Sequence, residues 1–270
     1  MFIYSLTRLR CGAAFRLIWI KEQCRSPVII AGMDTDFPLS ADSLSQSSTV
    51  RFLERLPLFE DLDGEAISRL ARGASEVSLP AGSVVFRQGD APVAVYIIVD
   101  GQVKLSLQTA RGDERVIELI GRGENFGAVP ILLQERHPLT AETIADSLLL
   151  PLSRNAVLEE LERNAEFSCR MLREVCQRLQ QRTRDFENCM VLNGSQRVMN
   201  FLLDQIPDGA EGKSVAVTLP AKKGIIASRL NLTHEHFSRI LHEIQAAGLI
   251  EVRGREIRMI DVGRLRAFPG

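Results

Sequence analysis

The chain has 270 residues, and its 33 Lys and Arg against 34 Asp and Glu give a formal net charge of -1 at pH 7. A composition that is 45% hydrophobic and 25% charged is typical of a globular protein and excludes fibrous and wholly disordered chains. No apolar stretch reaches the roughly 18 to 20 residues of a membrane span, so we expect a cytoplasmic protein with no membrane partner.

The cysteines favour a reducing compartment. There are five, an odd number, and none forms a Cys-x-x-Cys pair. Unpaired thiols in a reduced protein are the simplest interpretation, and we predict no metal site. The five cysteines are Cys11, Cys24, Cys169, Cys176 and Cys189.

Residues 1–48 are expected to form a disordered extension. Phe15 to Ile20 is apolar apart from Arg16, but it lacks the continuous apolar core and small-residue cleavage site of a signal peptide. The tract from residue 34 to 48 is rich in Ser, Asp and Pro, as disordered segments are. Met33 is an alternative start of the chain.

Residues 49–152 are predicted to form a sensory β-barrel domain. Short helical patterns begin near Thr49 and near residue 64, and the hydrophobic period changes to that of strands from Val77. The strands recur about every ten residues with glycine at the corners, as at Asp100-Gly101. This spacing indicates a small antiparallel barrel or jelly roll that closes near residues 147–152.

Residues 153–193 are predicted to be a helical region with a dimerisation helix. Apolar residues from Leu172 onward alternate spacings of three and four, which is a heptad seam with one charged interruption. The alternative is packing against the chain's own barrel, but a helix of about 25 residues with a straight seam favours a homodimer. The seam consists of Leu172, Val175, Leu179, Arg182, Phe186 and Cys189.

Residues 194–270 are predicted to form a winged helix-turn-helix domain. A helix from Ile225 to Leu230 is followed by a turn at Asn231 and Leu232 and by a second helix that Thr233 caps. Two alternating segments around Arg253-Gly254-Arg255 then form a β-wing. The fold class is therefore α+β, an N-terminal antiparallel barrel followed by a long helix and a C-terminal winged helix-turn-helix.

The second helix carries the residues that we expect to contact DNA bases. Glu235, Ser238 and Arg239 stand at i, i+3 and i+4, so they project from one face. Arg donates to guanine O6 and N7, Glu accepts from cytosine N4, and Ser adapts to either edge. The alternative is a solvated charged face on an ordinary amphipathic helix, but the preceding helix and the wing favour DNA.

A second set of residues is expected to contact the DNA backbone. Phosphate contacts fix position without reading sequence. From Arg197 to Gly270 there are 11 Lys and Arg against 8 Asp and Glu, a mild basic excess that suits double-stranded DNA. The backbone set consists of Lys222, Lys223, Thr233, His234, His236, Arg253 and Arg255.

The order of barrel, long helix and winged helix-turn-helix resembles the CRP/FNR superfamily of bacterial transcription regulators over about residues 50 to 268. Gly82-x3-Phe86-x-Gln88-Gly89-Asp90 and Asp100-Gly101-x-Val103 are similar to that family's barrel corners. The resemblance implies a dimeric activator that is switched by an effector at the barrel and contacts RNA polymerase.

The recognition helix resembles one branch in particular. Glu235-x2-Ser238-Arg239 matches the FNR-type signature, which implies half-sites of the TTGAT type in an inverted repeat. The run from His234 to Leu241, with Gly248-Leu249-Ile250, is similar to the Dnr branch of nitric-oxide-responsive regulators of denitrification genes.

Two effectors known in the superfamily do not suit this sequence. Its cyclic-nucleotide binders carry a Glu for the ribose and an Arg for the phosphate, but Ala128 or Val129 and Pro138 or Leu139 stand there. Arg136 would need a slip of two residues. We therefore expect no cyclic AMP. No cysteine lies between residues 25 and 168, so we expect no iron–sulfur cluster either.

Haem b is the cofactor that the branch resemblance implies, held in an apolar cavity between barrel and dimer helix. His137 is the one histidine before the DNA-binding domain and the candidate axial ligand. The alternative is an exposed loop histidine and a plain barrel core. Candidate lining residues are Phe126, Val129, Ile131, Leu132, Leu133 and Leu172.

Two other classes of function remain open at this point. One is a CRP/FNR-type regulator with a different apolar or redox effector, or with none. The other is an enzyme or store on a cupin-like barrel. A barrel with one histidine has no two-His-one-carboxylate set, and no nucleophile and base gather in the sequence, so we expect no enzyme.

Overall fold

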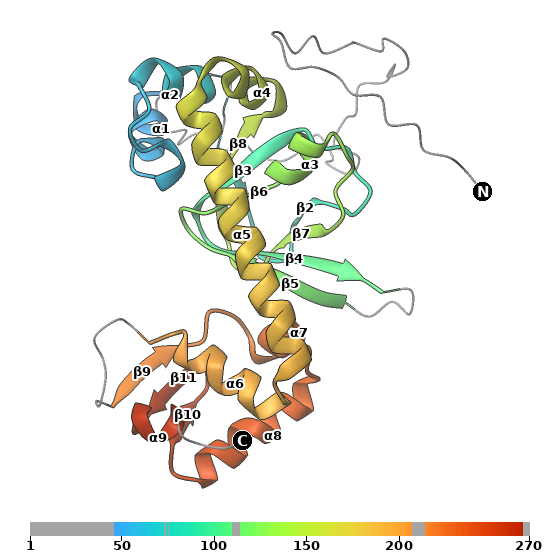
Figure 1. Ribbon diagram of the computed structural model, residues 1–270, viewed down its shortest axis with the longest axis vertical. Coiled ribbons are helices and arrows are strands. Elements are labelled where there is room, and N and C mark those ends of the chain that lie inside the picture. The colour runs from blue at the N-terminus through green and yellow to red at the C-terminus, as the bar shows by residue number, and fades with distance from the viewer. Residues whose placement is uncertain (1–45, 73, 75, 110–113, 207–213, 267–270) are drawn as a thin grey trace, which may run out of the picture. The chain divides into compact units, whose positions relative to one another are not determined.

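The computed structural model describes residues 46–72, 74, 76–109, 114–206 and 214–266 (Figure 1). All of these belong to one compact unit, Asp42–Gly270. The expected extension, residues 1–48, lies outside the described residues except at its end. No helix of the described part is long and apolar enough to cross a membrane.

A small helical layer precedes the barrel. It consists of α1 (Gln46–Leu53), the 3-10 turn η1 (Pro57–Phe59) and α2 (Gly64–Ala71). Asp63 starts α2, since its carboxylate accepts from the backbone N–H of Ala66 at 2.5 Å.

The β-domain is a sandwich of two four-stranded antiparallel sheets. The first has the order β1-β8-β3-β6 and the second β2-β7-β4-β5. Phe86, Ile98 and Phe126 are among the buried residues between them. The strands are β1 (Val77–Leu79), β2 (Val84–Phe86), β3 (Ala94–Asp100), β4 (Val103–Gln108), β5 (Glu114–Ile120), β6 (Asn125–Phe126), β7 (Thr140–Thr143) and β8 (Ser147–Ser153).

The turn at Asp100-Gly101 joins β3 to β4 as predicted, and it requires glycine. Gly101 has a φ of 92°, and a Cβ there would lie within 2.3 Å of the Ser147 hydroxyl oxygen. The Ser147 hydroxyl also accepts from the N–H of Gln102 at 3.1 Å, which holds the corner against β8.

A short helix within the β-domain was not predicted. The apolar segment Ala128–Leu133 forms α3, with Ile131 buried beneath it. Val129, Leu132 and Leu133 are exposed instead of facing a cavity. The period of so short an apolar run does not distinguish a helix from barrel core.

The helical region divides into α4 (Arg154–Arg163) and α5 (Ala165–Val191). Asn164 separates them and caps α5 by accepting from the N–H groups of Glu166 and Phe167. Phe167 and Met171 are buried against the N-terminal helices and barrel, while the rest of α5 is largely exposed. In Figure 1, α5 is the long helix that leads toward the C-terminal domain.

The C-terminal domain is a winged helix-turn-helix around one core that includes Phe237 and Leu241. The first helix begins at Gly194, since Asn193 and Gln196 form a capping box. The wing has a third strand that was not predicted, which gives the order β10-β11-β9. The elements are α6 (Gly194–Leu203), β9 (Val215–Thr218), α7 (Lys223–Arg229), α8 (His234–Ala246), β10 (Ile250–Arg253), β11 (Glu256–Met259) and α9 (Val262–Arg266). The predicted fold class is confirmed.

Candidate nucleic-acid interface

Helix α8 presents one polar face and buries the other. Phe237, Ile240 and Leu241 are 0%, 1% and 3% exposed and fix the helix to the domain. Glu235 and Arg239 lie on the exposed face, with Ser238 half-buried beside them. The structure therefore places the three predicted base-reading residues together on the solvent side of α8.

The guanidinium of Arg239 is available for an incoming ligand. Its side chain is 67% exposed. Its ion pair with Glu243 is long, since Nε lies 3.9 Å from the carboxylate. A pair of that length and exposure contributes little stability, so a base edge can replace it at small cost.

Glu235 is held in its charged form at the start of the helix. Its pKa is lowered, chiefly by a hydrogen bond from its own backbone N–H and then by Thr233. An ionised carboxylate accepts hydrogen bonds only, which is the chemistry that a cytosine amino group requires.

Two of the residues predicted to contact the DNA backbone have structural roles within the protein. The Thr233 hydroxyl caps α8 by accepting from the N–H of His236 at 3.2 Å. The half-buried ring of His236 lies against the start of α6, where Cε1 would be 3.3 Å from a Cβ at position 194. The cap at Thr233 was predicted, whereas the packing of His236 against α6 was not.

Other predicted backbone contacts are accessible. Lys222 is exposed at the N-cap position of α7, followed by the half-buried Lys223, and a helix N-terminus favours phosphate. His234 is exposed at the start of α8.

The two wing arginines differ. Arg253 has an 81% exposed side chain, whereas Arg255 donates from Nε and Nη2 to the carbonyl of Leu219, at 3.1 and 2.7 Å. Arg255 thus holds the wing to the domain.

The apolar residues of the predicted seam form a stripe along α5, whereas Arg182 of that seam pairs with Glu118 of the barrel. The side chains of Leu172, Leu179 and Phe186 are 63%, 66% and 65% exposed, Val175 is half-buried and Cys189 is exposed. The stripe continues through Met190 and Val191, which sequence reasoning missed because they follow the last complete heptad. Exposed apolar patches on one face of a helix mark interaction surfaces.

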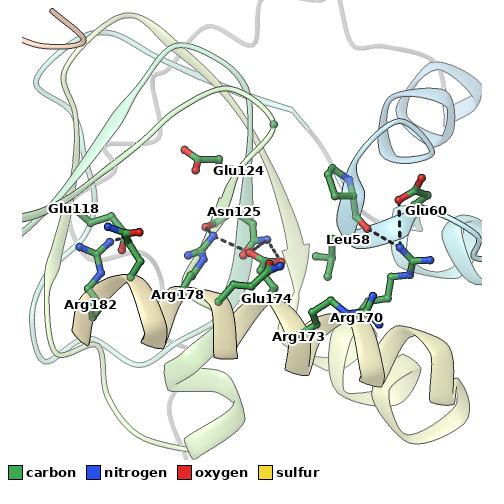
Figure 2. Close-up of a pocket in the computed structure, with 14 residues that line it drawn as sticks. Leu58, Glu60, Glu118, Glu124, Asn125, Arg170, Arg173, Glu174, Arg178 and Arg182 are labelled. Atoms are coloured by element: carbon green, nitrogen blue, oxygen red, sulfur yellow. Dashed lines mark hydrogen bonds and ion pairs between the residues drawn. The ribbon is translucent and has the colours of Figure 1, made fainter. Parts of the chain in front are cut away.

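A pocket of about 510 Å³ lies beside α5 and is lined mainly by charged groups (Figure 2). Asn125 donates to both carboxylate oxygens of Glu174, at 2.7 and 2.9 Å, and Arg178 donates to the Asn125 carbonyl. The sequence did not point to Glu174 or Arg178, because charges on a long helix usually face solvent. The charged lining consists of Glu60, Glu118, Glu124, Arg170, Arg173, Glu174, Arg178 and Arg182.

The residues proposed for haem do not fit that group. Phe126 is in the core between the two sheets, and Ile131 is packed in the cluster that includes Phe167 and Met171 of α5. Val129, Leu132 and Leu133 are on the surface of α3, and Leu172 is on the exposed stripe. None of them lines the pocket beside α5. The described residues therefore do not gather the expected apolar cavity between barrel and helix.

His137 is a buried residue and not an exposed loop histidine. It is 3% exposed, and its ring stacks on Phe86 with centroids 3.6 Å apart. Burial lowers its pKa to about 4, so the imidazole is neutral at pH 7. Its burial and its stack on Phe86 give His137 a packing role in the barrel core.

The positions that correspond to a cyclic-nucleotide site have other roles here. Ala128 begins α3, and Leu139 packs against the barrel core. Arg136 donates to the Gly89 carbonyl at 2.8 Å, which ties two barrel corners together. Within the described residues, no group of three His, Cys, Asp or Glu side chains is arranged to hold a metal ion.

Comparison with known proteins agrees with this architecture. The cyclic nucleotide-binding domain family matches residues 76–164, and the Crp-like helix-turn-helix domain family matches residues 196–268. The CRP-like cAMP-activated global transcriptional regulator of Mycobacterium tuberculosis is 25% identical over 215 residues, which cover 79% of this chain and 96% of that protein.

One solved structure shares the fold, and another is similar in sequence. FixK2 from Bradyrhizobium japonicum shares the fold, with a TM-score of 0.64 and 22% identity over 73% of this chain and 98% of that one. DNR from Pseudomonas aeruginosa is 30% identical, over 81% of this chain and 96% of that one, with a TM-score of 0.44. The chain belongs to the CRP/FNR family of DNA-binding transcription regulators.

Proposed function

We propose that this regulator binds an inverted repeat with TTGAT-type half-sites. The observation that carries the proposal is the polar face of α8, where Glu235, Ser238 and Arg239 lie together while the opposite face is buried. Arg239 would donate to a guanine and Glu235 would accept from a cytosine amino group. Lys222 and Arg253 would contact phosphates on either side.

The protein is proposed to act as a homodimer through α5. The apolar stripe of Leu172, Leu179 and Phe186 is exposed, and a second copy of α5 would bury it. A two-fold dimer places its two recognition helices about 34 Å apart, one turn of DNA, which is why the target is proposed to be palindromic.

Nitric oxide bound to haem stays a proposal that rests on the resemblance to the Dnr branch. The pocket beside α5 is lined mainly by charged groups and does not support it. Activation of transcription, control of denitrification genes and contact with RNA polymerase rest on the same resemblance. An effector that acts between barrel and α5 would alter how the two recognition helices are presented.

The test is an in vitro selection from a random duplex pool. It is run with the protein alone, with added haem, and with haem and nitric oxide under anaerobic conditions. Enrichment of a TTGAT palindrome in any arm supports the DNA proposal, and enrichment in the third arm alone supports the effector. Equal enrichment in all arms removes nitric oxide, and no enrichment in any arm contradicts the DNA proposal.

A further inference from the structure

The connection between α5 and the DNA-binding domain is short. Helix α5 ends at Val191 and α6 begins at Gly194, so Leu192 and Asn193 alone join them. Asn193 is fixed by the capping box with Gln196, whose amide oxygen accepts from the Asn193 N–H at 3.0 Å. This junction therefore has little freedom of its own.

Arg197 bonds the junction to the helix-turn-helix. Its Nη1 donates to the carbonyl of Leu192 at 2.8 Å, and its Nε donates to the carbonyl of Leu230 at 3.0 Å. Leu192 follows the end of α5, and Leu230 is the C-cap of α7. Carbonyls at helix C-termini lack partners in their own helix and carry partial negative charge, so one guanidinium satisfies both ends.

A second contact, independent of Arg197, joins the junction to the helix-turn-helix. A Cβ on Gly194 would lie 3.2 Å from Leu232 and 3.3 Å from both His236 and Ile240. Leu232 is in the turn, and His236 and Ile240 are on α8. The backbone at the junction thus packs directly on the turn and on the recognition helix.

We propose that Arg197 is a positioning residue that fixes the direction of α8 relative to α5. Movement of α5 then reaches the recognition helix instead of being absorbed between Val191 and Gly194. The proposal deepens the proposed function, since it names how that function is transmitted. Arginine suits the role because its rigid fork holds two acceptors at once, whereas a lysine ammonium acts as a point charge.

Double electron–electron resonance between two spin labels on one chain tests this directly. Labels are placed at Gln180→Cys on α5 and His242→Cys on α8, both exposed, with the native cysteines replaced by serine. Labelled protein is diluted with unlabelled protein so that each dimer holds at most one label pair. We expect a narrow distance distribution for the parent and at least a twofold wider one for Arg197→Ala.

The matched control is Arg258→Ala. This variant also removes a guanidinium and a hydrogen bond in the same domain, to the Ser214 hydroxyl at 2.9 Å, but away from the junction. Its distribution should keep the parent width. If Arg197→Ala does not fold, Arg197→Gln takes its place, because a glutamine side chain is too short to span both carbonyls. A parent-like width in the folded Arg197 variant overturns the proposal, and since no DNA is present the result is independent of DNA binding.

Discussion

Arg182 on α5 pairs with Glu118 on β5, with Nη2 2.6 Å from Oε1. Its Nη1 also donates to the Ile117 carbonyl at 2.9 Å and pairs with Asp185 at 3.0 Å. The charged interruption of the predicted seam is therefore engaged with the barrel. The stripe that α5 leaves exposed is correspondingly apolar, and α5 is tied to the barrel by the same contact.

The ion pair between Arg182 and Glu118 should stabilise the fold measurably. We expect a coupling energy of about 0.5 to 1 kcal/mol in a double-mutant cycle of Arg182→Ala and Glu118→Ala, since both side chains are partly buried. Urea denaturation of the four proteins measures it. The matched cycle is Arg163 and Glu159, an exposed pair at 3.9 Å, which should couple near zero. Equal coupling in the two cycles would contradict the assignment.

A charge placed in the stripe should dissociate the dimer. Phe186→Glu puts a carboxylate on an apolar position that is 65% exposed in the single chain and buried in the proposed pair. Sedimentation velocity should show a monomer for this variant and a dimer for the parent. Gln180→Glu adds the same charge to the same helix off the stripe and should stay dimeric. A dimeric Phe186→Glu would exclude this face as the interface.

Buried His137 should make stability fall in mild acid. Its folded pKa of about 4 lies below the unfolded value of 6.5, so the unfolded chain takes up a proton first as pH falls. The contribution of neutral His137 to the free energy of unfolding is complete above pH 6.5. It is lost between pH 6.5 and 4, by at most about 3 kcal/mol. Thermal or urea melts of the parent and His137→Leu should converge as pH is lowered. A constant difference between them would show that His137 does not titrate there.

The wing arginines should differ in the salt dependence of DNA binding. Arg253→Gln and Lys222→Gln each remove an exposed charge, so the slope of log K against log salt should decrease by about 1 to 2. Arg255→Gln should instead lower the melting temperature, because Arg255 holds Leu219. Anisotropy titrations at several salt concentrations provide the slopes. A lower slope for Arg255→Gln alone would reverse the assignment.

Local signals were sufficient for the two helices of the recognition unit and for the barrel corners. Thr233 is a strong N-cap, the periodicity of Phe237, Ile240 and Leu241 identifies the buried face, and Gly101 marks a turn that excludes a side chain. These features depend on residues close together in the chain.

Features that depend on distant residues were not predictable. The bonds from Arg197 to Leu230 and from Arg255 to Leu219 join positions more than 30 residues apart, and nothing in the local sequence distinguishes such arginines from solvated ones. His137 is similar, since its burial follows from stacking on Phe86, far away in the sequence. The expected haem cavity was inferred from resemblance, and the packing of α3 places its residues elsewhere.

The central claim is that α8 reads DNA bases through Arg239, and the most direct measurement compares parent and Arg239→Ala by anisotropy on a TTGAT…ATCAA duplex and on a scrambled duplex. We expect the variant to lose about 1 to 3 kcal/mol of binding free energy per half-site on the palindrome. Binding to the scrambled duplex should change far less. Equal affinity of Arg239→Ala and parent for the palindrome would contradict the account.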